Sequence, residues 1–192
     1  MTDNIYAAPL ANFDEPKAVT SSDDRFYVVS TRKLLILYFM TLGFYLRYWN
    51  YKNWALHNKA TDEGVWPIPR TIFSVFFQHS LYRNVADHDA SGERGPWDAG
   101  KYATQMVVLL ITSNILWRLS GKGLAWPYID IGVLVLLLPT GLLLKNVQAE
   151  INARCGDASG ASNASFSAAN IIWCVIGVLL WVLALANMLI PD

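Results

Sequence analysis

Residues 168–190 read AANIIWCVIGVLLWVLALANMLI and contain no charged residue. The hydrocarbon core of a bilayer is about 30 Å thick, and an α-helix crosses it with about 20 residues. This stretch is long enough to cross completely. It therefore predicts a transmembrane helix and indicates that the chain is a membrane protein.

Two further apolar runs precede that helix. Residues 102–119 (YATQMVVLLITSNILWRL) carry no charge before Arg118, and residues 124–144 (LAWPYIDIGVLVLLLPTGLLL) carry only Asp130. The short Gly-rich connection at 121–123 predicts that the two runs form an antiparallel hairpin, and Pro139 predicts a kink in the second run. We therefore predict three transmembrane helices, at 102–119, 124–144 and 168–190.

The segments 34–54 and 70–86 are apolar but shorter. The uncharged part of the first, 34–46, has 13 residues, and the uncharged part of the second, 71–82, lies between two arginines. Uncharged stretches of about 10–14 residues are more often interfacial or re-entrant than spanning. We predict that both are membrane-embedded or interfacial helical segments, and that the first enters the membrane and returns near Gly43.

The distribution of positive charge predicts the orientation, because Lys and Arg gather on the cytoplasmic side of a membrane. If neither short segment crosses, thirteen of the 15 Lys and Arg residues share one side, and only Arg118 and Lys122 lie on the other. If one or both cross, the split is nine to six. We favour the first arrangement, which places the N-terminus in the cytoplasm and the C-terminus in the periplasm.

Composition agrees with a membrane protein. Of the 192 residues 54% are hydrophobic and only 16% are charged, whereas soluble domains carry about 25% charged residues. The 15 basic residues balance the 15 acidic ones, so no basic surplus suggests a nucleic-acid partner. We predict an all-α fold, an integral membrane helical bundle, with a flexible cytoplasmic tail at 1–30 and one helical membrane domain at 31–192.

A set of aromatic and polar motifs runs through the chain. The runs Thr41-Leu42-Gly43-Phe44-Tyr45 and Tyr48-Trp49-x-Tyr51-Lys52-Asn53-Trp54 precede Phe76-Phe77-Gln78-His79-Ser80-Leu81-Tyr82. The patterns Val147-Gln148-x-x-Ile151-Asn152 and Phe166-Ser167-x-x-Asn170 follow. Over roughly residues 26–190 this set resembles a family of small multi-pass bacterial inner-membrane proteins whose function is not known. The resemblance implies a bacterial inner-membrane location and no particular reaction.

The aromatic and polar run at 44–54 is the densest candidate binding surface. Tyr and Trp rings favour the headgroup region of a bilayer, and Arg47 and Lys52 can reach lipid phosphates. Simple membrane anchoring explains such a run, and a lipid or partner interface is the functional interpretation. The residues that we predict for that interface are Arg47, Tyr48, Trp49, Tyr51, Lys52 and Trp54.

Other polar residues suggest weaker candidate sites. Asp130 is the only acid inside a predicted span, and a charge in a membrane often marks an ion pathway, so Asp130 and Asn114 form a candidate polar membrane site. Asp130 also lies about one turn from the helix start, where headgroup water can reach it. The side chains of His79, Asp87, His88 and Asp89 suit Zn²⁺ or Mn²⁺, but their spacing does not. We predict no metal, no cofactor and no catalytic residue.

These observations leave three classes of function. The first, which we favour, is a non-catalytic membrane protein that acts as an accessory subunit, a scaffold or a lipid- or partner-binding protein. The second is an oligomeric channel or small transporter subunit that uses Asp130 and Asn114. The third and most remote is a metal-dependent membrane enzyme. The expected partners are the lipid bilayer and either another membrane protein or a second copy of the chain.

Overall fold

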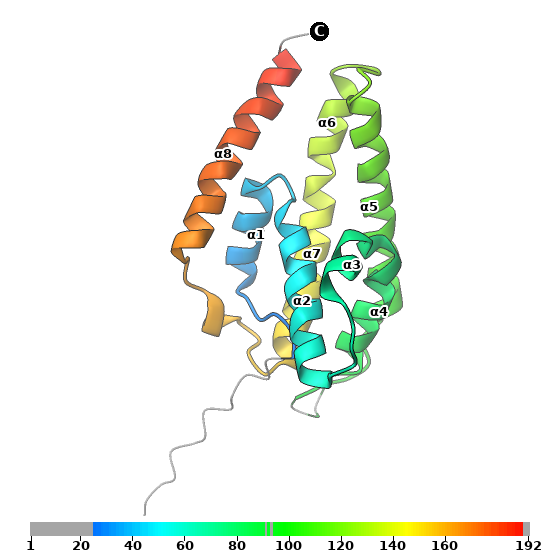
Figure 1. The fold of residues 1–192 in the computed structure, drawn as a ribbon, viewed down its shortest axis with the longest axis vertical. Helices are drawn as coiled ribbons and strands as arrows, with labels where there is room; N and C mark the ends of the chain where they lie inside the picture. The colour runs from blue at the N-terminus through cyan, green and yellow to red at the C-terminus, as the bar shows by residue number, and fades with distance from the viewer. Residues whose placement is uncertain (1–24, 91, 93, 190–192) are drawn as a thin grey trace, which may run out of the picture.

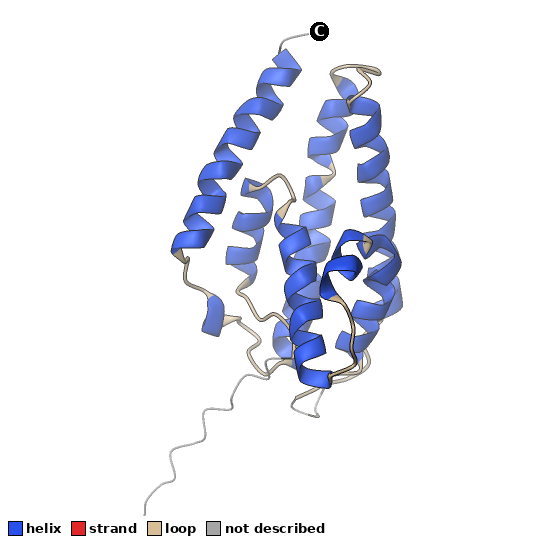
Figure 2. Cartoon of the chain, in the orientation of Figure 1, coloured by secondary structure: helices blue, strands red, loops and turns tan. Residues whose placement is uncertain are grey.

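The computed structural model of this chain describes residues 25–90, 92 and 94–189, and these residues form helices and loops without a strand (Figure 2). The predicted all-α fold is therefore confirmed. The helices in chain order are α1 (Thr31–Met40), α2 (Tyr45–Thr61), α3 (Pro67–Ile72), α4 (Ser74–Ala86), α5 (Ala99–Ser120), α6 (Tyr128–Val135), α7 (Leu137–Arg154), the 3₁₀ turn η1 (Ala161–Asn163) and α8 (Ala168–Leu189).

The first two helices form a hairpin that ends about halfway along the longer helices (Figure 1). The chain reverses at Leu42 and Gly43, whose φ angles are 50° and 84°. The left-handed conformation at Gly43 ends α1 in the usual way, and its N–H donates to the carbonyl of Tyr38 at 2.8 Å. The predicted reversal of the chain near Gly43 is confirmed, and its predicted entry into the membrane stays a prediction.

Helices α5 and α6 run antiparallel, as the connection at 121–123 predicted (Figure 1). The second helix is interrupted at Leu136, so that α6 and α7 follow each other closely. Pro139 has no N–H to donate to the carbonyl of Val135. At the next position, the hydroxyl of Thr140 donates to the carbonyl of Leu136 at 2.8 Å. This interruption lies where the proline predicted a kink.

The described residues contain two helices that are long and apolar enough to cross a membrane, not the predicted three. They are Tyr128–Arg154, which comprises α6 and α7, and Ala168–Leu189, which is α8. The prediction of a span at 102–119 was therefore wrong. Helix α5 has 22 residues and so is long enough, but its composition is not apolar enough. Its apolar run is diluted by polar side chains: Thr104, Gln105, Thr112, Ser113, Asn114 and Arg118.

The buried core occupies one half of the molecule. It gathers where α2, α4, the first half of α5 and the second half of α7 meet, in the lower part of Figure 1. The largest side chains buried there include Trp49, Trp54, Tyr82, Met106 and Ile151. By contrast, α8 buries only Gly177. The chain therefore combines a densely packed base with helices whose apolar surfaces are left open.

Residues 25–30 belong to this base. Phe26 and Val29 are almost completely buried, although the segment forms no helix. The prediction of a flexible tail over 1–30 was therefore wrong for its last residues, because their backbone is bonded to polar side chains of α2 and α7. The rest of that predicted tail, 1–24, lies outside the described residues.

Candidate functional site

Helix α2 carries the aromatic and polar run, and its period of 3.6 residues divides the run between two faces. Phe44, Arg47, Tyr48 and Tyr51 are spaced at i, i+3, i+4 and i+7 and are all exposed; we call them the exposed stripe. Lys52 lies at its edge, with its ammonium group 6.0 Å from the ring centre of Tyr27. Three of the six residues predicted for the interface, Arg47, Tyr48 and Tyr51, belong to this exposed stripe.

Trp49 and Trp54 lie on the opposite face of α2 and are fully buried. Their assignment to a lipid or partner interface was therefore wrong. The indole N–H of Trp49 donates to the side-chain oxygen of Gln148 on α7, and Trp54 lies 4.3 Å beneath the guanidinium of Arg70. Both rings hold helices together inside the base instead of anchoring it in a membrane.

Three buried amides around Trp49 bind the segment 27–29. Asn53, Gln148 and Asn152 form this amide clamp, which gives the extended backbone the partners that a neighbouring strand would give. Asn53 accepts from the N–H of Tyr27 at 3.1 Å, and Gln148 donates to the carbonyl of Tyr27 at 2.8 Å. Asn152 accepts from the N–H of Val29 at 3.2 Å and donates to its carbonyl at 2.9 Å.

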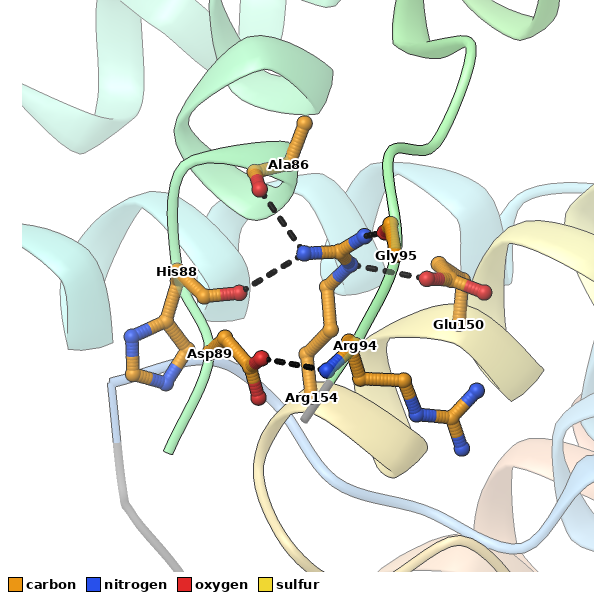
Figure 3. A network of polar contacts seen from close by, with 7 residues as sticks. All are labelled: Ala86, His88, Asp89, Arg94, Gly95, Glu150 and Arg154. Carbon is orange, nitrogen blue, oxygen red and sulfur yellow. Dashed lines mark hydrogen bonds and ion pairs between the residues drawn. The ribbon is translucent and has the colours of Figure 1, made fainter. Parts of the chain in front are cut away.

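Arg154, at the end of α7, organises a second buried network (Figure 3). Its guanidinium donates to the backbone carbonyls of Ala86, His88 and Gly95 at 2.8, 3.1 and 3.0 Å. It also forms an ion pair with Glu150 at 2.7 Å. Because the side chain is only 2% exposed, these partners offset the cost of burying its charge. Arg154 thus fixes the loop between α4 and α5.

Sequence analysis alone did not assign a role to the clamp or to Arg154. The spacing of Gln148 and Asn152 beside Val147 and Ile151 was a usable signal, since it places the two amides on the same helical face as two apolar residues. All four of these side chains are buried. These polar groups bond the protein's own backbone, so the structure gives them an architectural role.

The exposed stripe borders a cavity of about 440 Å³ between the start of α2 and α8. Phe44, Arg47 and Tyr48 line it from α2, and Trp173 and Leu180 line it from α8. Thr41 also lines it, but its hydroxyl is occupied: it donates to the carbonyl of Leu37 at 2.7 Å and accepts from the N–H of Tyr45 at 3.0 Å. The cavity walls are therefore apolar, and Arg47, the one cationic residue that borders them, is exposed.

A second cavity, of about 280 Å³, lies between α6–α7 and α8. Its lining includes Phe39, Leu134, Leu138, Trp181 and Met188, and none of the lining residues is charged. The two cavities are separated by the tip of α1, where the indole of Trp181 donates to the carbonyl of Phe39 at 2.9 Å. Helix α8 therefore contacts the tip of α1 between the two cavities, and near its other end the carbonyl of Asn187 accepts a hydrogen bond from the indole of Trp126 at 3.2 Å.

The weak metal candidates do not converge on one point. The ring of His79 lies 3.1 Å from the hydroxyl of Thr104, whereas Asp89 accepts from the N–H of Arg94 at 2.7 Å. His88 is buried with its ring against Phe26, and Asp87 ends helix α4. Within the part of the chain that the structure describes, no three His, Cys, Asp or Glu side chains are placed to hold a metal ion.

Asp130 and Asn114, the candidate polar membrane site, are each bonded locally. Asp130 accepts a hydrogen bond from the hydroxyl of Ser120 at 2.7 Å, which joins α6 to the end of α5. Asn114 is exposed and donates to the carbonyl of Leu110 in its own helix at 2.8 Å. Among the described residues, no hydrogen bond joins the two side chains. The structure thus gives Asp130 a role in the hairpin and does not bring the pair together as one site.

His57 is a buried titratable group that packs beside the segment held by the amide clamp. Its ring stacks on Phe26 with 5.5 Å between the ring centres, and its Nε2 lies 2.9 Å from the amide of Asn84. Burial lowers the pKa of His57 below its ordinary value of 6.5, and the carboxylate of Glu63 at 3.4 Å offsets this only in part. The neutral imidazole is thus the form that packs into the base.

Comparisons of the chain with protein-family models, with curated protein sequences and with solved structures find no match. The resemblance to a bacterial inner-membrane family, based on the motifs at 41–54, 76–82, 147–152 and 166–170, stays a prediction.

Proposed function

We propose that this chain is a non-catalytic multi-pass membrane protein that binds a membrane partner as an accessory subunit or scaffold. The observation that carries the proposal is the surface of α8. This helix has 22 residues without a charge, and large apolar side chains are exposed around most of its circumference, including Ile172, Val175, Leu179, Val182, Leu183 and Leu189. An uncharged apolar helix exposed in this way requires lipid or another protein around it.

The short helix α3 and the start of α4 support the same location. Trp66, Ile68, Ile72, Phe73 and Phe76 are all more than half exposed, and they follow one another over two short helices. The guanidinium of Arg70 turns inward over Trp54 and so leaves this surface apolar. Such a patch suits a segment that lies in the bilayer interface, as the sequence predicted for 70–86.

The distribution of Lys and Arg along the chain supports the proposed orientation. Arg118 in the last turn of α5 and Lys122 in the connection to α6 lie at the upper end of the molecule in Figure 1. The opposite end contains the segment 25–30, the loop after α2 and the loop between α7 and α8. The other thirteen Lys and Arg residues lie elsewhere in the chain. This asymmetry favours an orientation in a bacterial inner membrane that places the base in the cytoplasm and the C-terminus in the periplasm.

The attachment of α8 supports partner binding. Its main helix contact is α1, on the side of Gly177, where its backbone meets the carbonyl of Met40. At 100° per residue, Val175, Leu179 and Val182 lie on the side of α8 away from Gly177. All three are more than half exposed. This outer face of α8 offers a partner helix a continuous apolar surface. The amide clamp and Arg154 bond the backbone of the base itself, which supports a role other than catalysis.

The proposal is tested by gentle extraction of the tagged chain from its host membrane and native mass spectrometry. We expect the chain to resist carbonate extraction and to retain a second membrane protein in fixed ratio. Replacing Val175, Leu179 and Val182 by Ala should release that protein. The control variant has Val108, Ile111 and Ile115 of α5 replaced by Ala. These three side chains are similarly exposed and share one face of that helix.

A chain that carbonate removes from the membrane would refute the membrane location. A chain that stays in the membrane but is found as a monomer or a homo-oligomer would refute the accessory-subunit role. Loss of the partner in both triple variants would show that the outer face of α8 has no specific part in binding.

A further inference from the structure

The cavity between α2 and α8 has apolar walls and a single cationic residue at its border. Phe44, Trp173 and Leu180 supply apolar surface, and Arg47 lines the same space with the aliphatic part of its exposed side chain. The phenol of Tyr48 borders it beside Arg47 and is 42% exposed. Such a combination suits an amphiphile that has an apolar tail and an anionic head.

Neither helix that forms this cavity contains a carboxylate. Residues 26–61, which include α1 and α2, hold five cations, Arg32, Lys33, Arg47, Lys52 and Lys59, and no Asp or Glu. Residues 168–189, which form α8, are uncharged. Ion pairs within the described residues join His57 to Glu63 and Arg154 to Glu150, and Arg47 takes part in neither. Within the described residues, Arg47 thus has no carboxylate partner, which suits a counter-charge from a bound ligand.

The position of the cavity along α8 indicates how deep in a bilayer it would lie. A Cβ atom added at Gly177 would lie 2.1 Å from the carbonyl oxygen of Met40, so the tip of the α1–α2 hairpin touches α8 at that residue. Gly177 is nine residues from Ala168, which is about 14 Å along a helix, and Trp173 is about 8 Å along it. If α8 spans the bilayer, Arg47 lies below the headgroups, where a lone charge is costly and a long side chain extends toward phosphate.

We propose that this cavity is a binding site for a phospholipid with an anionic headgroup, an assignment that rests on the proposed membrane function. One acyl chain fills the apolar space between Phe44, Trp173 and Leu180. The guanidinium of Arg47 donates two parallel hydrogen bonds to the phosphate, as its planar shape allows. A zwitterionic lipid of the same chain length binds less tightly, because its own ammonium group competes with Arg47 for the phosphate.

The test reconstitutes the full chain in nanodiscs that contain equal amounts of phosphatidylglycerol and phosphatidylcholine with identical acyl chains. Native mass spectrometry after release then counts the lipids that remain bound. We expect phosphatidylglycerol to be retained about tenfold more than phosphatidylcholine. Arg47→Gln should remove this preference, whereas Lys59→Gln, which removes an exposed cation at the other end of α2, should leave it intact.

A second variant tests the apolar half of the site. Leu180→Trp fills the cavity without changing a charge, so it should reduce the retained phosphatidylglycerol severalfold although Arg47 is present. Circular dichroism of each variant confirms that the helices are intact before lipid is counted.

Several outcomes would overturn the assignment. Equal retention of the two lipids by the wild-type chain, or an equal loss in Arg47→Gln and Lys59→Gln, would show that no specific headgroup site exists. Displacement of the lipid by millimolar inorganic phosphate would assign Arg47 to free phosphate. If the chain stays in the membrane in carbonate and yet shows no preference, the lipid site fails while the proposed membrane location stands.

Discussion

The indole N–H of Trp49 donates a hydrogen bond to the side-chain oxygen of Gln148, ninety-nine residues further along the chain. The same Gln148 donates to the carbonyl of Tyr27, and its side chain is fully buried. One amide therefore joins α2, α7 and the segment that precedes α1. The interior of the base is held together by polar contacts as well as by apolar packing.

Replacing Gln148 by Leu should destabilise the base strongly. The substitution keeps the volume but leaves the N–H of Trp49 and the carbonyl of Tyr27 buried without partners, at about 1–3 kcal/mol for each. We expect a clear fall in the thermal unfolding temperature in detergent, measured by intrinsic tryptophan fluorescence. The matched control is Gln105→Leu on the exposed surface of α5. An equal effect of the two substitutions would contradict the role assigned to Gln148.

Much of the path of the chain could be predicted because it depends on local chemistry. A glycine at the left-handed position, as at Gly43, ends a helix wherever it occurs. Pro139 interrupts a helix because it lacks an N–H, and the long uncharged run of α8 forms one helix by length alone. These features need no knowledge of distant residues.

The division of the aromatic run into two faces could not be predicted in the same way. Trp49 and Tyr48 are neighbours of similar character, and both suit a bilayer interface. Which of them is buried depends on whether α7 presents a partner, and Gln148 presents one only to Trp49. Similarly, Arg154 has the charge of a surface residue, and only the fold brings three carbonyls within its reach.

Arg154→Lys should loosen the loop between α4 and α5. A single ammonium group cannot replace the planar guanidinium that bonds the carbonyls of Ala86, His88 and Gly95. We expect much faster amide hydrogen exchange at residues 87–90, 94 and 95, together with a loss of about 3 kcal/mol in the free energy of unfolding. Arg83→Lys, at an exposed position of α4, serves as the control. Unchanged exchange in the Arg154 variant would refute the bracing role.

The stability of the base should fall as the pH drops below 6.5. The folded protein keeps His57 neutral because burial lowers the pKa of this side chain below the value of 6.5 that it has when unfolded. Below that pH the unfolded chain binds a proton that the folded chain resists, so the free energy of unfolding decreases. Above it His57 is neutral in both states and contributes no pH dependence.

Denaturation curves in detergent at a series of pH values between about 5 and 8 measure this effect. His57→Asn removes the titrating group and should flatten the curve in this range, whereas His79→Asn, at a side chain that bonds Thr104 on the surface, should not. A pH dependence that persists in His57→Asn would assign it to another group.

Gly177→Ala should separate α8 from the hairpin. The added Cβ would lie 2.1 Å from the backbone oxygen of Met40, which cannot rotate away, so one of the two helices has to move. Such overpacking costs about 1–3 kcal/mol and opposes the gain of up to about 1 kcal/mol that alanine usually brings to a helix.

Gly132→Ala in α6 is the matched control, because its Cβ would meet only the side chain of Leu116 at 3.4 Å. Thermal unfolding in detergent should therefore show a lower midpoint for Gly177→Ala and an equal or higher one for Gly132→Ala. In Gly177→Ala the bond from Trp181 to the carbonyl of Phe39 should also weaken, which a red shift of tryptophan emission reports when the ring meets water. A midpoint equal to that of the control would show that α8 is free to shift at no cost, and the depth assigned to the lipid cavity would then have no fixed reference.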